Sequence, residues 1–472
     1  MAACTVGPDY AGPPNLASAS DEGEFVRAAD GFAAGEPRLA KWWEVLGDPV
    51  LNRLEEQALA QNPDLAIAQA RLDEAAAALG ESKAGSYPVI SGNTMAAHVR
   101  VPGIDLGNSA DTGSSSSGDT TSQTIYNLGL NASWEIDLFG GHQRQVEAAR
   151  ANRAAATASL ADAQVGLTSA VAQTYINLRA LRETLGMAEQ VEADRAAMLT
   201  LARQLYDEGA APQGEVEKAE RAFEQAGRDT RQLRGDAEVL LNALAVLTGV
   251  APGAVDDIAI GNAPPPLPPA EVAIGDPADL LLRRPDIRAA ERQYAAATAQ
   301  IGVARAAGLP RLSFLGILGI GGTKFSDLTA LDDFLAIGAP RLQWSMFDFG
   351  RNRAQVAQAE ARSDGAEATY RKTVLTALQE VEDALTRFRY RREDVAALAR
   401  IESSTAREVE LARQRFEEGA ASRLELLEAA IAHAQARQAL AQGRAGLTLD
   451  FIAVEDALGL GWSGAPAPLA AR

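Results

Sequence analysis

The sequence predicts an α+β membrane protein built from two structural repeats, each with a helical stretch, a pair of long strands and a very long helical segment. Three observations lead to this fold class. Motifs recur at a constant distance along the chain, the segment from Tyr126 to Leu138 alternates apolar and polar side chains, and the helical segments run for long stretches without proline.

Charge and composition exclude several classes of function. The 472 residues include 44 Lys and Arg against 63 Asp and Glu, a net charge of -19, which argues against a nucleic-acid partner. One cysteine and three widely separated histidines do not make a metal site, so we expect no metal and no cofactor. No nucleophile, base and acid form a discernible set, so we expect no enzyme. The sequence contains no run of 18 apolar residues, so it predicts no membrane-spanning helix.

The repeat rests on two sequence offsets. Tyr-Asp-Glu-Gly-Ala-Ala at 206–211 recurs as Phe-Glu-Glu-Gly-Ala-Ala at 416–421, which is an offset of 210. Asn-Pro-Asp-Leu at 62–65 matches Arg-Pro-Asp-Ile at 284–287, which is an offset of 222. The difference of 12 between the offsets is explained by a Gly- and Ser-rich loop at 107–118 in the first half only.

The strands have the length and pattern of membrane strands. From Tyr126 to Leu138 apolar residues alternate strictly with Asn, Gly, Ser, Glu and Asp, which predicts a strand with one apolar face. A strand in a soluble protein usually has about 5–6 residues, and a membrane strand about 9–11. A long strand in a soluble sandwich remains the alternative. The other strands expected are 89–101, 312–320 and 335–347.

Four strands are too few to close a membrane barrel. The smallest barrels have about 8 strands, and open sheet edges do not occur in lipid. Strands that span a membrane here must therefore belong to a barrel shared between chains. Two chains would supply 8 strands and three would supply 12.

The helical segments predict a rod or a hollow helical cylinder. Val374, Val381, Phe388 and Val395 recur every seven residues, which is coiled-coil spacing. Residues 141–190 alone would extend roughly 75 Å as a helix. An ordinary antiparallel bundle is the alternative, but it does not explain why each long helical segment follows an amphipathic strand. The direct connections from strand to helix at Phe139-Gly140 and Phe349-Gly350 favour a β-barrel stacked on an α-barrel.

Five short motifs resemble one known family in their order and spacing. They are Cys4-Thr5-Val6-Gly7-Pro8-Asp9-Tyr10, Trp42-Trp43 followed by Asp48-Pro49-Val50-Leu51, Asn62-Pro63-Asp64-Leu65, Leu282-Arg283-Arg284-Pro285-Asp286-Ile287, and Asp348-Phe349-Gly350-Arg351. The chain resembles, over essentially its whole length, the NodT-type outer-membrane factors. These lipoproteins are the TolC-like exit ducts of resistance-nodulation-division (RND) efflux pumps.

The resemblance implies a fold, a location and partners. It selects a homotrimer with a 12-stranded outer-membrane barrel, four strands per chain, continued by a long periplasmic α-barrel with an equatorial domain. It implies a location in the bacterial outer membrane and a lipid attached to Cys4. The implied partners are a periplasmic membrane-fusion (adaptor) protein, an inner-membrane RND transporter and outer-membrane lipid. The implied function is passive export of drugs or other small toxic compounds. The alternatives are a TolC-like duct for type I polypeptide secretion and, from another class, a soluble coiled-coil scaffold.

The domain division combines the repeat with the resemblance. It assigns an N-terminal lipid-anchor and equatorial segment, a first repeat, a proline-rich linker, a second repeat and a C-terminal tail, at 1–50, 51–262, 263–272, 273–462 and 463–472. The strands are expected at about 88–139 and 310–349, and the long helices at about 140–250 and 350–460.

The resemblance also implies a gate at the periplasmic ends of the helical hairpins, which we expect near 189–195 and 399–405. We expect Glu402 and Glu408 to form acidic rings, Ile401 an apolar constriction, and Arg400 and Arg407 tethers between helices. A ring of three carboxylates would attract cations. Glu189 and Glu192 would meet the adaptor or the neighbouring hairpin. For each residue the alternative is a solvated, charged helix end.

Overall fold

The computed structural model describes residues 5–14, 25–28, 32–33, 35, 37–102, 120–257, 264–277, 280, 283–329 and 334–462. Cys4, the Gly- and Ser-rich loop at 107–118 and the C-terminal tail lie outside the described residues. The chain divides into two compact units. The sheet unit comprises Met1–Pro13, Glu74–Ala154 and Arg292–Glu367, and the helical unit comprises Pro14–Asp73, Ala155–Glu291 and Ala368–Arg472.

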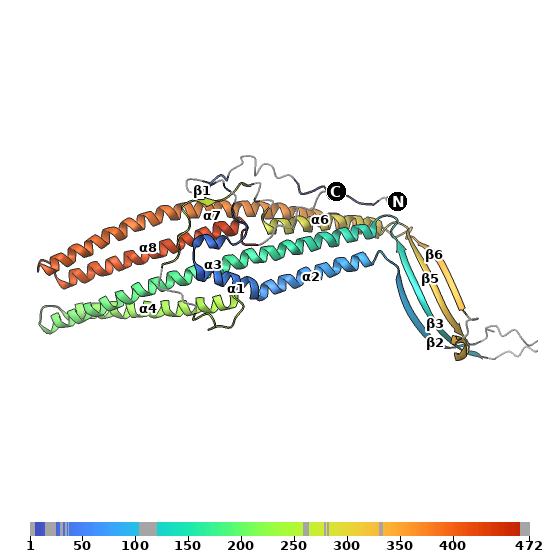
Figure 1. The fold of residues 1–472 in the computed structure, drawn as a ribbon, viewed down its shortest axis with the longest axis horizontal. Coiled ribbons are helices and arrows are strands. Elements are labelled where there is room, and N and C mark those ends of the chain that lie inside the picture. The colour runs from blue at the N-terminus through green and yellow to red at the C-terminus, as the bar shows by residue number, and fades with distance from the viewer. Residues whose placement is uncertain are drawn as a thin grey trace, which may run out of the picture. The chain divides into compact units, whose positions relative to one another are not determined.

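The sheet unit contains one antiparallel sheet with the strand order β2-β3-β5-β6 (Figure 1). Its strands are β2 (Val89–Pro102), β3 (Thr120–Ile136), β5 (Arg311–Gly322) and β6 (Phe334–Gln343). The register pairs Val89 with Ser133, Tyr126 with Gly322, and Arg311 with Gln343. Since the order keeps each hairpin together, β3 and β5 are the central strands, and β2 and β6 lie at the edges.

Two strand boundaries differ by more than two residues from those expected. β3 begins at Thr120 rather than Tyr126, because Thr and Gln continue the extended chain without the apolar alternation that marked the strand. β6 ends at Gln343 rather than Phe347. Gln343 pairs with Arg311, the first residue of β5, so the residues after it have no strand of their own sheet to pair with.

Among the residues that the structure describes, four helices have residues in both units, and three belong to the helical unit alone. The first set is α2 (Pro63–Ala84), α3 (Gly141–Asp207), α6 (Pro285–Ala306) and α7 (Arg351–Glu417), and the second is α1 (Pro49–Gln61), α4 (Gln213–Leu247) and α8 (Arg423–Ala457). The helices α3 and α7 have 67 residues each, and α4 and α8 have 35 each. The helix α3 therefore continues past Gln190 to Asp207. None of the helices described is long and apolar enough to cross a membrane.

The helical unit is held together by one large apolar core around the segment before α1. Trp42 and Trp43 of the short helix η2 (Trp42–Leu46) are fully buried, together with Tyr175 of α3 and Phe388 of α7. A two-stranded parallel sheet, β1 (Phe32–Ala33) with β4 (Val272–Ala273), lies beside this core. Segments far apart in the sequence thus meet where the Trp-Trp motif lies.

The hairpin ends are not where the sequence placed them. The turn between α3 and α4 covers 208–212 and the turn between α7 and α8 covers 418–422, so residues 189–195 and 399–405 lie inside continuous helices. The helices stop at glycines: Gly209 has φ +72° and Gly419 has φ +74°. These left-handed residues end a helix, as glycine commonly does. The expected positions of both tips were therefore wrong.

Candidate functional site

One face of the sheet is apolar and half-exposed. Leu128 and Leu130 of β3, Leu318 of β5 and Phe334 of β6 are 53%, 52%, 47% and 55% exposed. The register puts them on one face, since Leu128 pairs with Ile320, which in turn pairs with Phe334. A soluble protein covers such a continuous apolar face, and a membrane strand turns it to lipid.

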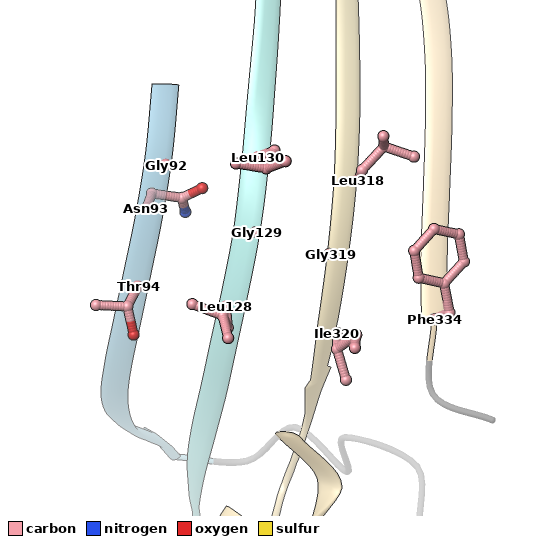
Figure 2. Close-up of a pocket in the computed structure, with 10 residues that line it drawn as sticks. All are labelled: Gly92, Asn93, Thr94, Leu128, Gly129, Leu130, Leu318, Gly319, Ile320 and Phe334. Atoms are coloured by element: carbon pink, nitrogen blue, oxygen red, sulfur yellow. The ribbon is translucent and has the colours of Figure 1, made fainter. Parts of the chain in front are cut away.

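A shallow hollow of about 480 Å³ crosses this apolar face (Figure 2). Its lining residues come from all four strands and are almost entirely apolar: Gly92, Asn93, Thr94, Leu128, Gly129, Leu130, Leu318, Gly319, Ile320 and Phe334. The hollow has no charged side chain in its lining. It is a feature of the apolar surface, and it has the chemistry of a site for hydrocarbon rather than for a polar ligand.

The opposite face is polar chiefly along β3, and the other strands add scattered polar residues such as Ser313 and Arg341. Asn127, Asn131, Ser133 and Glu135 lie there, as the alternation predicts. The neighbouring strands add apolar residues to the same face, such as Ile317, which pairs with Ile337. These neighbouring strands lack the strict period-two pattern, and the sheet is amphipathic chiefly at its second strand.

Two tryptophans occupy equivalent positions in the repeat, Trp134 near the end of β3 and Trp344 directly after β6. The indole Nε1 of Trp134 donates to the carbonyl oxygen of Ser86 at 3.1 Å, and that of Trp344 donates to Gly308 at 3.2 Å. Both rings remain partly exposed. A ring that is apolar at one end and hydrogen-bonded at the other suits the boundary between lipid and water.

The junction between β3 and α3 is covered by the N-terminal segment Thr5–Tyr10. The backbone N–H of Val6 donates to the carbonyl oxygen of Phe139 at 3.0 Å. Gly140 has φ +77°, and a Cβ on it would lie 2.6 Å from Thr5 Cγ2, so only glycine fits there. The buried Arg144 donates to Val6 O at 3.2 Å and to Asp9 Oδ1 at 2.5 Å. The segment after Cys4 is thus part of the fold. Sequence periodicity did not predict this, because the segment is extended and has no repeating pattern.

The second junction, between β6 and α7, is built differently. Asp348 accepts hydrogen bonds from the backbone N–H groups of Gly350 at 3.0 Å and Asn352 at 2.8 Å, which cap α7. These backbone bonds lower the pKa of Asp348. Phe349 has φ +55° and its side chain is fully exposed. The two predicted junctions are therefore alike in sequence but differ in their contacts.

The residues proposed for the adaptor contact and for the aperture lie along the helices of two hairpins. Glu189 of α3 accepts from Arg234 of α4 at 2.8 Å, and Glu192 is half-buried between the same helices, close to Gly227. The hydrogen bond to Glu189, together with the charge of Glu192, raises the pKa of Arg234. The first pair of acids therefore joins α3 to α4.

The second set lies on α7, opposite α8. Glu402 Oε1 lies 3.9 Å from His433 Nε2, and Arg407 donates to Ser403 at 2.8 Å. Arg400, Ile401 and Glu408 are exposed. The structure thus brings Glu402 to α8 and leaves Ile401 and Glu408 on the surface of the single chain.

The turns themselves were missed as candidate residues. In both, the N–H groups of the two alanines after the glycine bond back to one carbonyl: Ala210 and Ala211 to Leu205, and Ala420 and Ala421 to Arg415. At the second turn Ser422 and Glu425 form a capping box. The signal was present in the sequence, because glycine followed three residues later by Pro212 or by a capping Ser422 marks a helix stop and a new start.

A half-exposed apolar sheet of membrane length, followed by helices of 67 residues, defines the class of TolC-like outer-membrane factors. The chain belongs to the outer membrane efflux protein family, whose model matches residues 54–250 and 277–460. Members of this class are channels in the bacterial outer membrane that extend into the periplasm, and this chain is an outer-membrane efflux protein of the NodT type.

Individual relatives agree over nearly the full length. The chain is 29% identical to nodulation protein T of Rhizobium leguminosarum bv. trifolii, covering 91% of this chain and 88% of the relative. It is 30% identical to outer membrane protein OprJ of Pseudomonas aeruginosa, covering 98% and 94%. The solved structure of the outer-membrane channel OprN has a TM-score of 0.86, 32% identity, and coverage of 97% of this chain and all of that one.

Proposed function

We propose that this chain is the exit duct of a tripartite efflux pump, which passively conducts drugs or other small toxic compounds from a periplasmic adaptor and an inner-membrane RND transporter to the cell exterior. The observation that carries this proposal is the half-exposed apolar face of the sheet, in a chain whose described helices include none that could cross a membrane. The energy for transport would come from the transporter, so the duct needs only to open and close.

The working assembly is a homotrimer with a 12-stranded barrel, four strands from each chain. Among the described residues, β2 and β6 each have one edge without a partner strand, and lipid does not tolerate open backbone edges. The internal repeat supports a regular ring. The repeat offset of 210 relates the start of α7 to that of α3 and the start of α8 to that of α4, and the helices of each pair have the same length.

The aperture lies among the hairpins of the α-barrel. Ile401 and Glu408 are exposed on the single chain, as residues facing a shared lumen would be. Arg400 and Arg407 remain the proposed tethers between helices, and Glu402 the proposed acid near them. Contact with the adaptor falls on the turns at 208–212 and 418–422, with Glu189 and Glu192 further along the first hairpin. A lipid on Cys4 would add an anchor in the outer membrane.

Deletion of the gene in the bacterium that carries it tests this function. Cells without the chain should accumulate small fluorescent or toxic compounds, and a plasmid copy should restore their export. If accumulation is unchanged across a chemically varied panel while a secreted polypeptide disappears from the medium, the chain serves polypeptide secretion instead. If neither changes and the protein is soluble without detergent, it is a scaffold.

A further inference from the structure

We infer the register in which β6 of one chain pairs with β2 of the next: residues whose numbers sum to 436 face each other, so that Ala339 lies opposite Ala97 of the partner subunit. The inference rests on the proposed shared barrel. It specifies which atoms meet at the interface between copies, and it follows from the pairing inside one chain.

The two hairpins of the sheet share one register. In the first, Val89 pairs with Ser133. The sequence offsets are 222 for β2 and 210 for β3. Adding them to the residue numbers of this pair gives Arg311 and Gln343, which are paired in the second hairpin. The same holds along the whole of β5 and β6. The offsets therefore relate backbone pairing as well as sequence.

The same operation applies to the pair that joins the two hairpins. β3, the second strand of the first hairpin, pairs with β5, the first strand of the second, and Gly129 faces Gly319. The corresponding next step joins β6, the second strand of the second hairpin, to the first strand of a further hairpin. Among the described residues that strand can only be β2 of another copy, because β2 of the same chain already lies at the far edge. Gly129 and Gly319 then become Ala339 and Ala97 of the partner subunit.

This register joins each face of the sheet to the matching face of the neighbour. A shift by one residue would turn the apolar face of one chain against the other face of the next. Ile337 meets Val99 of the partner subunit on one face, and Leu342 meets Thr94 of the partner subunit on the other. All ten residues of β6 find a partner within β2, from Asn93 to Pro102. The open edges that lipid does not tolerate are thereby closed.

The hollow in Figure 2 reaches this interface at the β2 edge of the sheet. Gly92 and Thr94 line it at the outer edge of β2, and a Cβ on Gly92 would meet only a leucine side chain, at 3.8 Å. The register puts Trp344 of the partner subunit opposite Gly92, as Trp134 stands opposite Phe314 within the chain. An aromatic ring beside an edge glycine is a common way to stabilise such a position. The partner copy thus contributes a side chain to the rim of this hollow.

Disulfide trapping distinguishes this register from its neighbours. Directly opposed residues have Cα atoms about 4.5 or 5.5 Å apart, within the range that a disulfide spans, whereas diagonal neighbours are about 7–8 Å apart. Ala339→Cys should therefore be combined with Ala97→Cys, and in two matched controls with Met95→Cys or Val99→Cys, which lie on the same face but are displaced by two residues. The single Ala339→Cys variant controls for links through Cys4.

The full-length variants are oxidised in detergent and run on denaturing gels without reductant. The pair with Ala97→Cys should shift from the mass of one chain to that of three, because three links close the ring, and the two displaced pairs should stay largely at one chain. A second pair on the other face, Leu342→Cys with Thr94→Cys, should behave like the first. Strongest linkage in a displaced pair, or no linkage in any pair while the particles remain trimeric, overturns the register alone. Particles of one chain in native mass measurements overturn the proposed trimer as well.

Discussion

Replacing Asp48 by Asn should destabilise the helical unit by about 3 kcal/mol. Asp48 is 6% exposed, and its two carboxylate oxygens have different hydrogen-bond partners. Oδ1 accepts from the backbone N–H groups of Val50 at 2.8 Å and Leu51 at 3.2 Å, which caps α1. Oδ2 accepts from the Tyr175 hydroxyl at 2.8 Å and forms an ion pair with Arg179. Burial, followed by the bond to Asp48, raises the pKa of Tyr175 to about 12.

The magnitude follows from what each substitution leaves behind. Asn is a good helix cap, so Asp48→Asn retains the cap and removes only the charge. Arg179 then stays 11% exposed without its carboxylate, and removing one partner of a buried ion pair costs about 3–5 kcal/mol. A remaining bond from Arg179 to the carbonyl oxygen of Pro264 at 2.8 Å keeps the loss at the lower end. Asp48→Ala should cost about 1 kcal/mol more, because the cap is lost too.

The assay is thermal unfolding in detergent at one fixed scan rate, since membrane oligomers unfold irreversibly. Tyr175→Phe is the matched control: it removes the hydroxyl but keeps the ion pair, and it should cost only about 1 kcal/mol. A midpoint for Asp48→Asn no lower than that of Tyr175→Phe would contradict this prediction, because the buried charge of Arg179 would then not require the Asp48 carboxylate.

Three further predictions concern a tight turn, the aperture and a buried acid. Gly249→Ala should destabilise more than Gly419→Ala: both glycines have left-handed φ, worth about 1–2 kcal/mol, but a Cβ on Gly249 would collide with the carbonyl oxygen of Gln61 in α1 while Gly419 has open space. Equal midpoints would contradict this. Glu402→Gln with Glu408→Gln should weaken the cation preference of the channel in planar bilayers; unchanged conductance and selectivity would remove both residues from the aperture. Burial raises the pKa of Glu455 to about 8, so the folded state holds a proton that the unfolded state releases above about 4.5. Stability should therefore fall between about pH 4.5 and 8, by at most about 1.4 kcal/mol per pH unit, and Glu455→Gln should flatten that fall. Parallel pH profiles of the two proteins would show that Glu455 does not titrate in this way.

The sequence predicted those parts of the fold that have a period. The alternation from Tyr126 predicts the central strand because side chains alternate across a sheet, and a long proline-free stretch predicts a long helix. The ends of the helices were misplaced: a tip was expected near Glu189, but α3 continues to Asp207 and stops beside the glycine at 209. That glycine, with Pro212 after it, is a local signal that a closer reading finds.

Other features have no local signal at all. Tyr175 meets Asp48 across 127 positions of the chain, and neither residue carries a pattern that names the other. The N-terminal segment around Val6 is extended and aperiodic, so its place over the β3–α3 junction becomes visible only in three dimensions. The aperture residues depend on packing between copies, which a single sequence does not encode in any periodic form.

Electron microscopy of the purified protein in detergent tests the central claim most directly. The shared-barrel account predicts particles with three-fold symmetry, much longer than wide, with a narrow sheet-built end held in the detergent belt. Compact or filamentous particles that stay in solution without detergent would contradict it, because the half-exposed apolar face of the sheet would then have to be covered by something other than lipid.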